Sequence, residues 1–168
     1  MKRYREHMIR FVVLVLVQVL ILNQIELNGY INPFLYILFI LRLPPAMERE
    51  YVMLSAFALG FCIDVFSNSM GLHMGAAVFL AYMRPYLINI VTIRGGANVE
   101  TLNIKQLKLG RFVTYAGLAA LTHHFFLFYM DVFKFSQFFH TFLRATLSSI
   151  FTLILLLMTE YLTARNKR

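Results

Sequence analysis

The sequence predicts an all-α integral membrane protein, a bundle of six transmembrane helices with both chain ends on the cytoplasmic side. Of its 168 residues, 60% are hydrophobic and 14% are charged, and the mean hydropathy is +0.67, well above that of ordinary soluble domains. The segments 11–25, 65–83 and 112–130 contain no Asp, Glu, Lys or Arg. Such uncharged apolar runs are typical of helices that lie in lipid.

Breaks at charged and turn-forming residues divide residues 1–168 into six apolar segments of a single transmembrane domain. The expected spans are 8–26, 30–43, 49–66, 70–92, 111–130 and 137–162. Stretches such as FVVLVLVQVLIL do not alternate apolar with polar residues, which argues against the strands of a transmembrane barrel. The first span follows basic residues as a secretory signal does, but it lacks a small-residue cleavage site and is expected to stay attached.

Proline and glycine mark several of these boundaries. Pro44 and Pro45 remove two backbone donors and are expected to end the second span. Pro85 is expected to kink or break the fourth span, and Gly95-Gly96 opens the longest loop.

The distribution of Lys and Arg predicts which ends of the spans face the cytoplasm. Fourteen of the 16 basic residues fall on one side of the membrane: Lys2, Arg3, Arg5, Arg10, Arg42, Arg49, Arg84, Arg94, Lys105, Lys108, Arg111, Arg165, Lys167 and Arg168. Only Lys134 and Arg144 fall on the other side. Because cytoplasmic loops carry the excess of Lys and Arg, both termini are expected to be cytoplasmic.

Several classes of function find no support in the sequence. The net charge of +8 comes from residues at the ends of apolar runs and not from a basic stripe, which argues against nucleic-acid binding. Cys62 is the only cysteine and lies within an apolar run, so neither a disulfide framework nor a thiolate metal site is expected. Nucleophile elbows, phosphate loops and paired-carboxylate signatures are missing. We therefore expect no enzyme, no cofactor and no metal.

Ionisable residues near the outer ends of the spans are candidates for a polar pocket. Asp64 follows Glu50 by 14 residues, about 21 Å along a helix, which puts its carboxylate in the outer third of the membrane. The same level includes the candidate pocket residues His73, His123, His124, Asp131, His140 and Arg144. Because a carboxylate facing lipid is costly, Asp64 is expected to pair with Arg144 or with a histidine. The group forms either a ligand or partner site or a structural network that holds the helices in register.

Small residues predict where two helices approach each other closely. Ala56 and Gly60 are spaced by four residues on the third span, and Gly71 and Gly75 have the same spacing on the fourth. Such pairs allow backbones to come together, and within a six-helix chain they are expected to pack against each other rather than against a partner.

The same region resembles a known family. The pattern consists of Gly60-x-x-x-Asp64, Ser67, Gly71, Ala76 and Ala81-Tyr82-x-Arg84-Pro85, followed by His123-His124 and an L-F-x-x-D sequence that ends at Asp131. It resembles MreD, the rod shape-determining membrane protein, over residues 32–160. The size of the chain and its number of spans also match that family.

The resemblance implies a noncatalytic, multi-pass component of the bacterial inner membrane that acts in cell elongation, peptidoglycan synthesis and cell shape. It implies binding to the transmembrane helix of MreC and, through that complex, links to the MreB filament, the glycosyltransferase RodA and its penicillin-binding transpeptidase. It also implies a bundle similar to the substrate-binding subunits of energy-coupling-factor vitamin transporters. No family-wide catalytic or ligand residue is carried over.

A second interpretation stays open beside this scaffold. The outer polar residues around Asp64 and His124 are also compatible with a small-molecule, vitamin-type binding subunit of a membrane transporter. A bundle of this kind hosts many functions, so the fold does not separate the two interpretations. A specific ligand would favour the transporter subunit, and association with MreC would favour the scaffold. Under either interpretation, the basic residues are expected to contact anionic membrane lipids.

Overall fold

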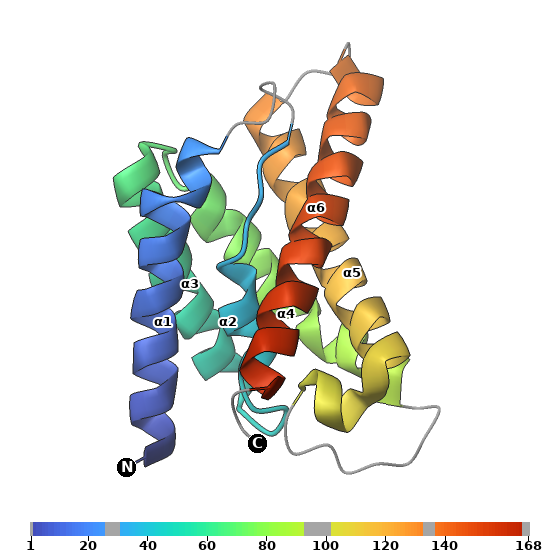
Figure 1. The fold of residues 1–168 in the computed structure, drawn as a ribbon. Coiled ribbons are helices and arrows are strands. Elements are labelled where there is room, and N and C mark those ends of the chain that lie inside the picture. The colour runs from blue at the N-terminus through green and yellow to red at the C-terminus, as the bar shows by residue number, and fades with distance from the viewer. Residues whose placement is uncertain (1, 26–30, 93–101, 133–136, 166–168) are drawn as a thin grey trace.

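The computed structural model describes residues 2–25, 31–92, 102–132 and 137–165, and helices dominate these residues. In chain order they are α1 (Lys2–Leu20), η1 (Leu22–Gln24), α2 (Ile37–Arg42), α3 (Arg49–Ser67), α4 (Leu72–Thr92), α5 (Ile104–Val132) and α6 (Phe138–Arg165), as Figure 1 shows. The predicted all-α class is confirmed.

Four helices in the described part of the chain are long and apolar enough to cross a membrane. They cover Arg5–Gln24, Arg49–Ser67, Leu72–Thr92 and Phe138–Ala164. Their outer faces expose large apolar side chains, including Leu54, Phe61 and Phe139, which in water would form an unfavourable surface. The structure therefore supports a membrane protein, with helices close to the predicted spans 8–26, 49–66, 70–92 and 137–162.

The predicted second span, 30–43, is not a continuous helix, and this prediction is corrected here. Residues 31–34 form no helical turn, and α2 has only six residues, about 9 Å of helix. Pro33 explains the difference, because it lacks an N–H group and pushes Asn32 away from helical backbone angles. The bundle accepts this extended segment because neighbouring helices bind its polar groups.

Two other expected breaks take a different form. Pro85 lies inside α4, which continues to Thr92 as one helix rather than ending after Arg84. The helix α5 begins at Ile104, inside the expected loop, and its path changes at Lys108, whose φ of 63° is not helical. Gly95 and Gly96 lie outside the described residues.

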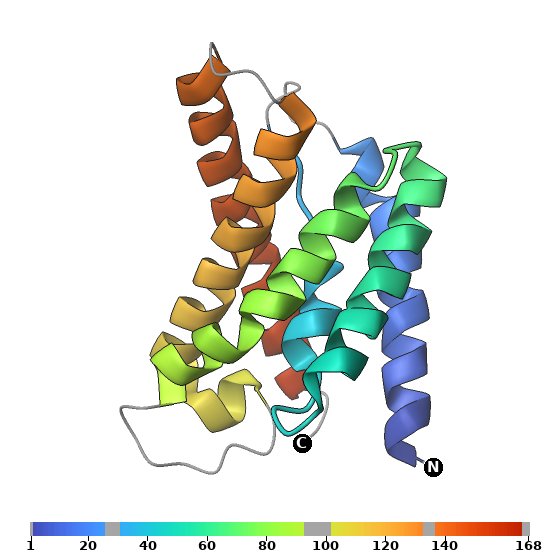
Figure 2. The same cartoon turned by 180° about the vertical axis from the view of Figure 1, so that it is seen from behind.

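The extended segment and α2 run through the middle of the bundle. Figures 1 and 2 show them between α1 and α3 on one flank and α5 and α6 on the other, with α4 running obliquely behind α2. Tyr36, Ile37, Ile40 and Leu41 have no exposed surface, so this short element forms the centre of the core. The start of α1 and the end of α6 lie at the same end of the molecule (Figure 1).

The turn between α3 and α4 depends on left-handed backbone angles. Asn68 (φ 53°) ends α3, and Met70 (φ 49°) and Gly71 (φ 90°) reverse the chain into α4. Gly71 thus serves the turn, and its expected contact with another helix is not formed, because an added Cβ would meet only the side-chain end of Met74. The turn points to the end of the bundle opposite the termini (Figure 1).

Gly60 brings α3 directly against the backbone of α4. A Cβ on Gly60 would lie 2.7 Å from both the carbonyl oxygen of His73 and the amide nitrogen of Met74, and closer still to the Cα of Met74. Ala56, one turn earlier, is fully buried. A Cβ added at Gly75 would lie 3.4 Å from the ring of Phe126, so the fourth-span glycine packs against α5. The small residues therefore support packing within the chain.

Gly60→Ala is expected to destabilise the fold by about 2 kcal/mol, because the new methyl group meets backbone that cannot move aside. Gly117→Ala is the matched control, since an added Cβ there meets only the Leu153 side chain at 3.6 Å. Replacing a helical glycine by alanine without a clash stabilises by about 0.5–1 kcal/mol. Unfolding of both purified variants in detergent measures the difference, and equal stabilities would contradict the close approach.

Candidate functional site

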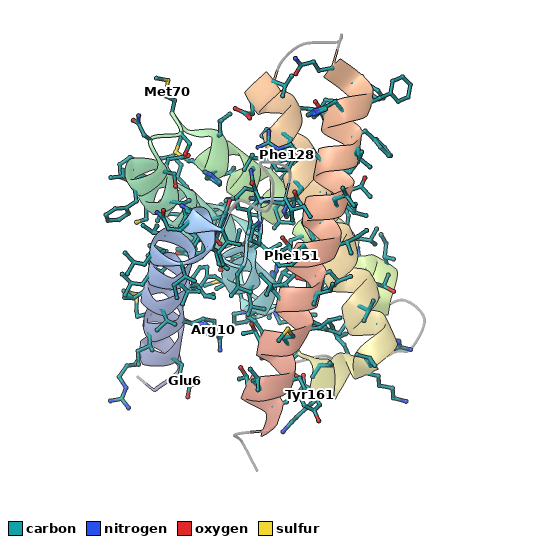
Figure 3. The ribbon with its side chains drawn as sticks, turned by 45° about the horizontal axis from the view of Figure 1, so that its top comes forward. Glu6, Arg10, Met70, Phe128, Phe151 and Tyr161 are labelled. Carbon is teal, nitrogen blue, oxygen red and sulfur yellow. The ribbon has the colours of Figure 1, made fainter. Side chains whose placement is uncertain are left out.

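A polar cavity of about 390 Å³ opens at the end of the bundle that carries the α3–α4 turn. It lies among the end of α1, η1, the extended segment, the α3–α4 turn and the facing parts of α5 and α6. Its polar lining consists of Asn23, Gln24, Asn32, Ser67, Ser69, His73, Asp131 and Arg144. In Figure 3, Phe128 lies on its α5 wall, and Met70 projects from the tip of the turn.

The structure brings most, but not all, of the candidate pocket residues to this cavity. His73, Asp131 and Arg144 line it directly. Asp64 and the two adjacent histidines, His123 and His124, are buried close to His73. His140 is exposed at the start of α6 and does not line the cavity.

Asp64 binds the first turn of α4 and not Arg144. Its carboxylate accepts hydrogen bonds from the backbone N–H of His73 (3.0 Å), the backbone N–H of Met74 (2.8 Å) and the hydroxyl of Ser69 (2.6 Å). An anion at a helix N-terminus satisfies donors that have no partner within the helix, and it interacts favourably with the helix dipole. The expected pairing with Arg144 or with a histidine ring is therefore replaced by a cap.

Arg144 forms one wall of the cavity. Its guanidinium lies 3.8 Å from the carboxylate of Asp131 and 4.4 Å from the ring centre of Phe128. When the Asn32 amide is oriented with its oxygen towards the arginine, that oxygen accepts a hydrogen bond of 2.8 Å. The Nε of Arg144 is buried and has no hydrogen-bond partner among the described residues. The cavity thus contains a cation that is only partly compensated.

Tyr36 links two histidines below the cavity. Its hydroxyl lies 3.0 Å from Nδ1 of His73 and 2.6 Å from Nε2 of His123. A hydroxyl has one proton, so it donates to one ring and accepts from the other. The hydrogen bond with Tyr36 occupies Nδ1 of His73. The His73 side chain also lines the cavity. Nδ1 of His123 is buried without a partner.

His124 belongs to a second chain of hydrogen bonds. Its Nδ1 donates to the carbonyl oxygen of Ala120 (2.8 Å), which leaves Nε2 to accept from the hydroxyl of Thr152 (3.1 Å). The oxygen of Thr152 in turn accepts the backbone N–H of Phe34 (3.1 Å). The ring of Phe34 contacts all three imidazoles, with centroid distances of 5.0, 5.5 and 5.0 Å. The histidines therefore surround the extended segment.

Further bonds to this segment come from both ends of the chain. The amide of Gln18, in α1, donates to the carbonyl of Pro33 (2.9 Å) and accepts the N–H of Tyr36 (3.4 Å). The hydroxyl of Ser148, in α6, accepts the N–H of Asn32 (3.1 Å). Gln18, Tyr36, Ser148 and Thr152 are not among the residues that the sequence predicts for this site. Two features of the sequence indicate these residues. Asn32-Pro33 interrupts an expected helix and so leaves backbone groups without partners, and Ser148 and Thr152 lie four residues apart on one face of the last span.

The chemistry available at this cavity is recognition by hydrogen bonds and charge. The serine hydroxyls are engaged, Ser69 with Asp64 and Ser67 with the amide of Asn23 (2.8 Å). Among the residues that the structure describes, His, Cys, Asp and Glu side chains do not form a group of three that could hold a metal ion. The cavity can accept a small polar molecule, with Arg144 and His73 as the principal contacts.

The residues of the Tyr82-x-Arg84-Pro85 pattern lie at the opposite end of the bundle. Arg84 is 3% exposed and donates to the carbonyl of Leu43, just after α2 ends. Tyr115 donates to the carbonyl of Leu41 (3.4 Å), so two side chains bind the carbonyl end of α2.

A buried ion pair joins α2 to α6 at this same end. Arg42 pairs with Glu160, which is 1% exposed. Arg10 shares a small cavity with this pair and projects from α1 towards α6 (Figure 3). Charged side chains from α1, α2 and α6 thus lie together at the end of the bundle that contains the termini.

Comparison of the chain with models of known families, with curated proteins and with solved structures gave no match.

Thr152→Val is expected to destabilise the protein by about 2 kcal/mol, because it leaves the Phe34 N–H and the His124 ring without their buried partner. Thr146→Val is the control, since within the described part of the chain that hydroxyl bonds only to the Phe142 carbonyl of its own helix. Denaturant unfolding in detergent should show little change for the control. If both variants lost the same free energy of unfolding, the stability of the extended segment would not depend on Thr152.

Proposed function

We propose that this chain is a noncatalytic membrane scaffold of the bacterial rod elongation complex, with the role that MreD has in its family. In this role the bundle binds the transmembrane helix of MreC and helps to position the peptidoglycan synthases. It reaches the MreB filament, RodA and its penicillin-binding transpeptidase only through that complex.

One observation carries this proposal: residues of the MreD-like pattern act as fold determinants. Gly60 contacts the backbone of α4, Asp64 caps α4, and Arg84 binds the carbonyl end of α2. Residues that fix helices in place are the ones a scaffold needs, since its function is the shape of its surface. This supports a role by position rather than by chemistry.

We further infer six membrane crossings, in a bundle similar to the substrate-binding subunits of energy-coupling-factor transporters. The fifth crossing is the part of α5 that follows the kink at Lys108 and ends at Val132, and it contains His123 and His124. The extended segment and α2 together make the second crossing, as a broken span covered by protein on both sides (Figures 1 and 2). The basic end with both termini then faces the cytoplasm of the inner membrane.

Cysteine labelling tests this topology. In a Cys62→Ala background, Met70→Cys, at a position 98% exposed, should react with a membrane-impermeant maleimide added outside spheroplasts. Ala46→Cys, in the exposed turn before α3, should react only after the membrane is permeabilised. Labelling of both positions from the same side would contradict an odd number of crossings between them.

The scaffold role predicts that the tagged chain, expressed at its native level in its own bacterium, copurifies with MreC in mild detergent. Depletion should give rounded cells, and Gly117→Ala should restore rods, because it leaves the packing intact. A tagged multi-pass protein of another complex is the control for nonspecific recovery. Normal cell shape after depletion, with MreC absent from the purified material, would contradict the proposal.

A second candidate, a small-molecule binding subunit of a transporter, is favoured by one observation. The 390 Å³ cavity is lined by the partly compensated Arg144 and by His73, and it opens at the proposed outer end. A scaffold does not require such a space, whereas a receptor for a small polar or anionic molecule does. If the purification described above recovered the tagged chain together with other transporter subunits and without MreC, this second candidate would be favoured.

A further inference from the structure

A second cavity, of about 170 Å³, lies at the end of the bundle that contains the termini. It is formed between the α2–α3 turn and the second half of α4, and its polar lining is Arg49, Arg84 and Asn89. Apolar residues complete the wall, among them Met47 and Ile88. The cavity is separate from the polar cavity described above and shares no lining residue with it.

Arg84 is a buried cation without a carboxylate partner at this cavity. It is 3% exposed, its Nη2 donates to the carbonyl of Leu43, and its Nε is buried without a hydrogen-bond partner. No Asp or Glu occurs among the described residues that line the cavity. A buried charge is costly unless it is paired, and the two groups that contact this guanidinium, the Leu43 carbonyl and the Tyr115 side chain, supply no carboxylate to balance it.

Arg49 adds a second positive charge from the other side. Its guanidinium lies 4.0 Å from the ring centre of Tyr82, and its Nη2 donates to the Tyr82 carbonyl (3.3 Å), which holds the side chain across to α4. Arg49 is also the first residue of α3, whose preceding residue, Glu48, makes no side-chain cap. The positive end of the α3 dipole therefore points to the same place. Glu48 and Glu50 are exposed and lie outside the cavity lining.

We propose that this cavity binds the phosphate group of an anionic phospholipid at the cytoplasmic face. Two guanidinium groups and a helix N-terminus provide the charge and the donors that a phosphate requires. A volume of 170 Å³ is several times the roughly 30 Å³ that one water occupies, which is enough for a phosphate group. The adjoining surface exposes Tyr86 and Ile90, against which acyl chains pack.

The apolar wall distinguishes a lipid from a free anion. A soluble phosphate uses only Arg49, Arg84 and Asn89, whereas a phospholipid also covers Met47, Ile88 and the exposed face of α4. Burial of apolar surface adds to affinity in proportion to area, so the lipid binds more tightly than the ion. The inference rests on the membrane location of the helices and on the topology proposed above, and it is independent of the scaffold role.

The test uses the full chain, purified in a neutral detergent and titrated with dioleoyl phosphatidylglycerol, with lipid binding followed by native mass spectrometry. Arg49→Gln should weaken the tightest binding step about fivefold to tenfold, since a charge-assisted contact is lost. Asn89→Asp, which adds a negative charge at the cavity, should have a similar effect. Lys105→Gln is the control, because it removes an exposed charge from the same end without touching this cavity.

Arg84→Gln is measured alongside these variants, but it also loses the hydrogen bond to the Leu43 carbonyl. Its lipid binding is compared with that of the other variants only if its helical circular dichroism matches that of the unmodified protein. Inorganic phosphate, added as a competitor, should leave the lipid binding intact. Equal weakening by Lys105→Gln, or no weakening by Arg49→Gln and Asn89→Asp, would overturn the site. Complete competition by inorganic phosphate would overturn the assignment to a lipid.

Discussion

The fold depends on how the bundle satisfies an extended segment of backbone in its middle. In lipid, each free N–H or C=O group costs several kcal/mol, so the non-helical residues 31–34 and the N–H of Tyr36 before α2 are tolerable only where other protein groups bind them. Gln18 in α1 and Ser148 and Thr152 in α6 provide those partners. The first and last helices are therefore tied to the same short segment, which allows non-helical backbone to lie at the centre of the bundle.

The histidines follow from this arrangement. Once the extended segment puts Phe34 and Tyr36 in the core, the rings of His73, His123 and His124 pack around them, and each ring forms a hydrogen bond. The polar cavity adjoins this cluster, with His73 in both. Three of the residues that the sequence suggests for a ligand site, His73, His123 and His124, are thus engaged in holding the segment. The parts that stay available are the His73 side of the cluster and Arg144.

The two ends of the bundle use charge in complementary ways. At one end, the carboxylate of Asp64 binds the N-terminal amides of α4, and at the other, Arg84 binds the carbonyl end of α2. Both contacts place a charge where the helix dipole favours it and where water is scarce. The difference is that Asp64 has three donors, whereas Arg84 keeps an unpaired Nε. That imbalance makes the cavity beside Arg84 a place for an anion.

The sequence by itself determined the class of the protein and its long helices, because uncharged apolar runs and glycine spacing are local signals. It also located Asp64, His73 and Arg144 near one end, since distance along a helix follows from residue number. It could not determine the path of residues 31–36 or the partner of Asp64. The path depends on which distant side chains come within hydrogen-bond distance, and Thr152 and Phe34 are 118 residues apart. The partners of Asp64 are near in sequence, and they depend on the left-handed turn that brings the start of α4 back to its carboxylate. Only the packed bundle decides that, because backbone satisfaction in lipid is a property of the whole tertiary structure.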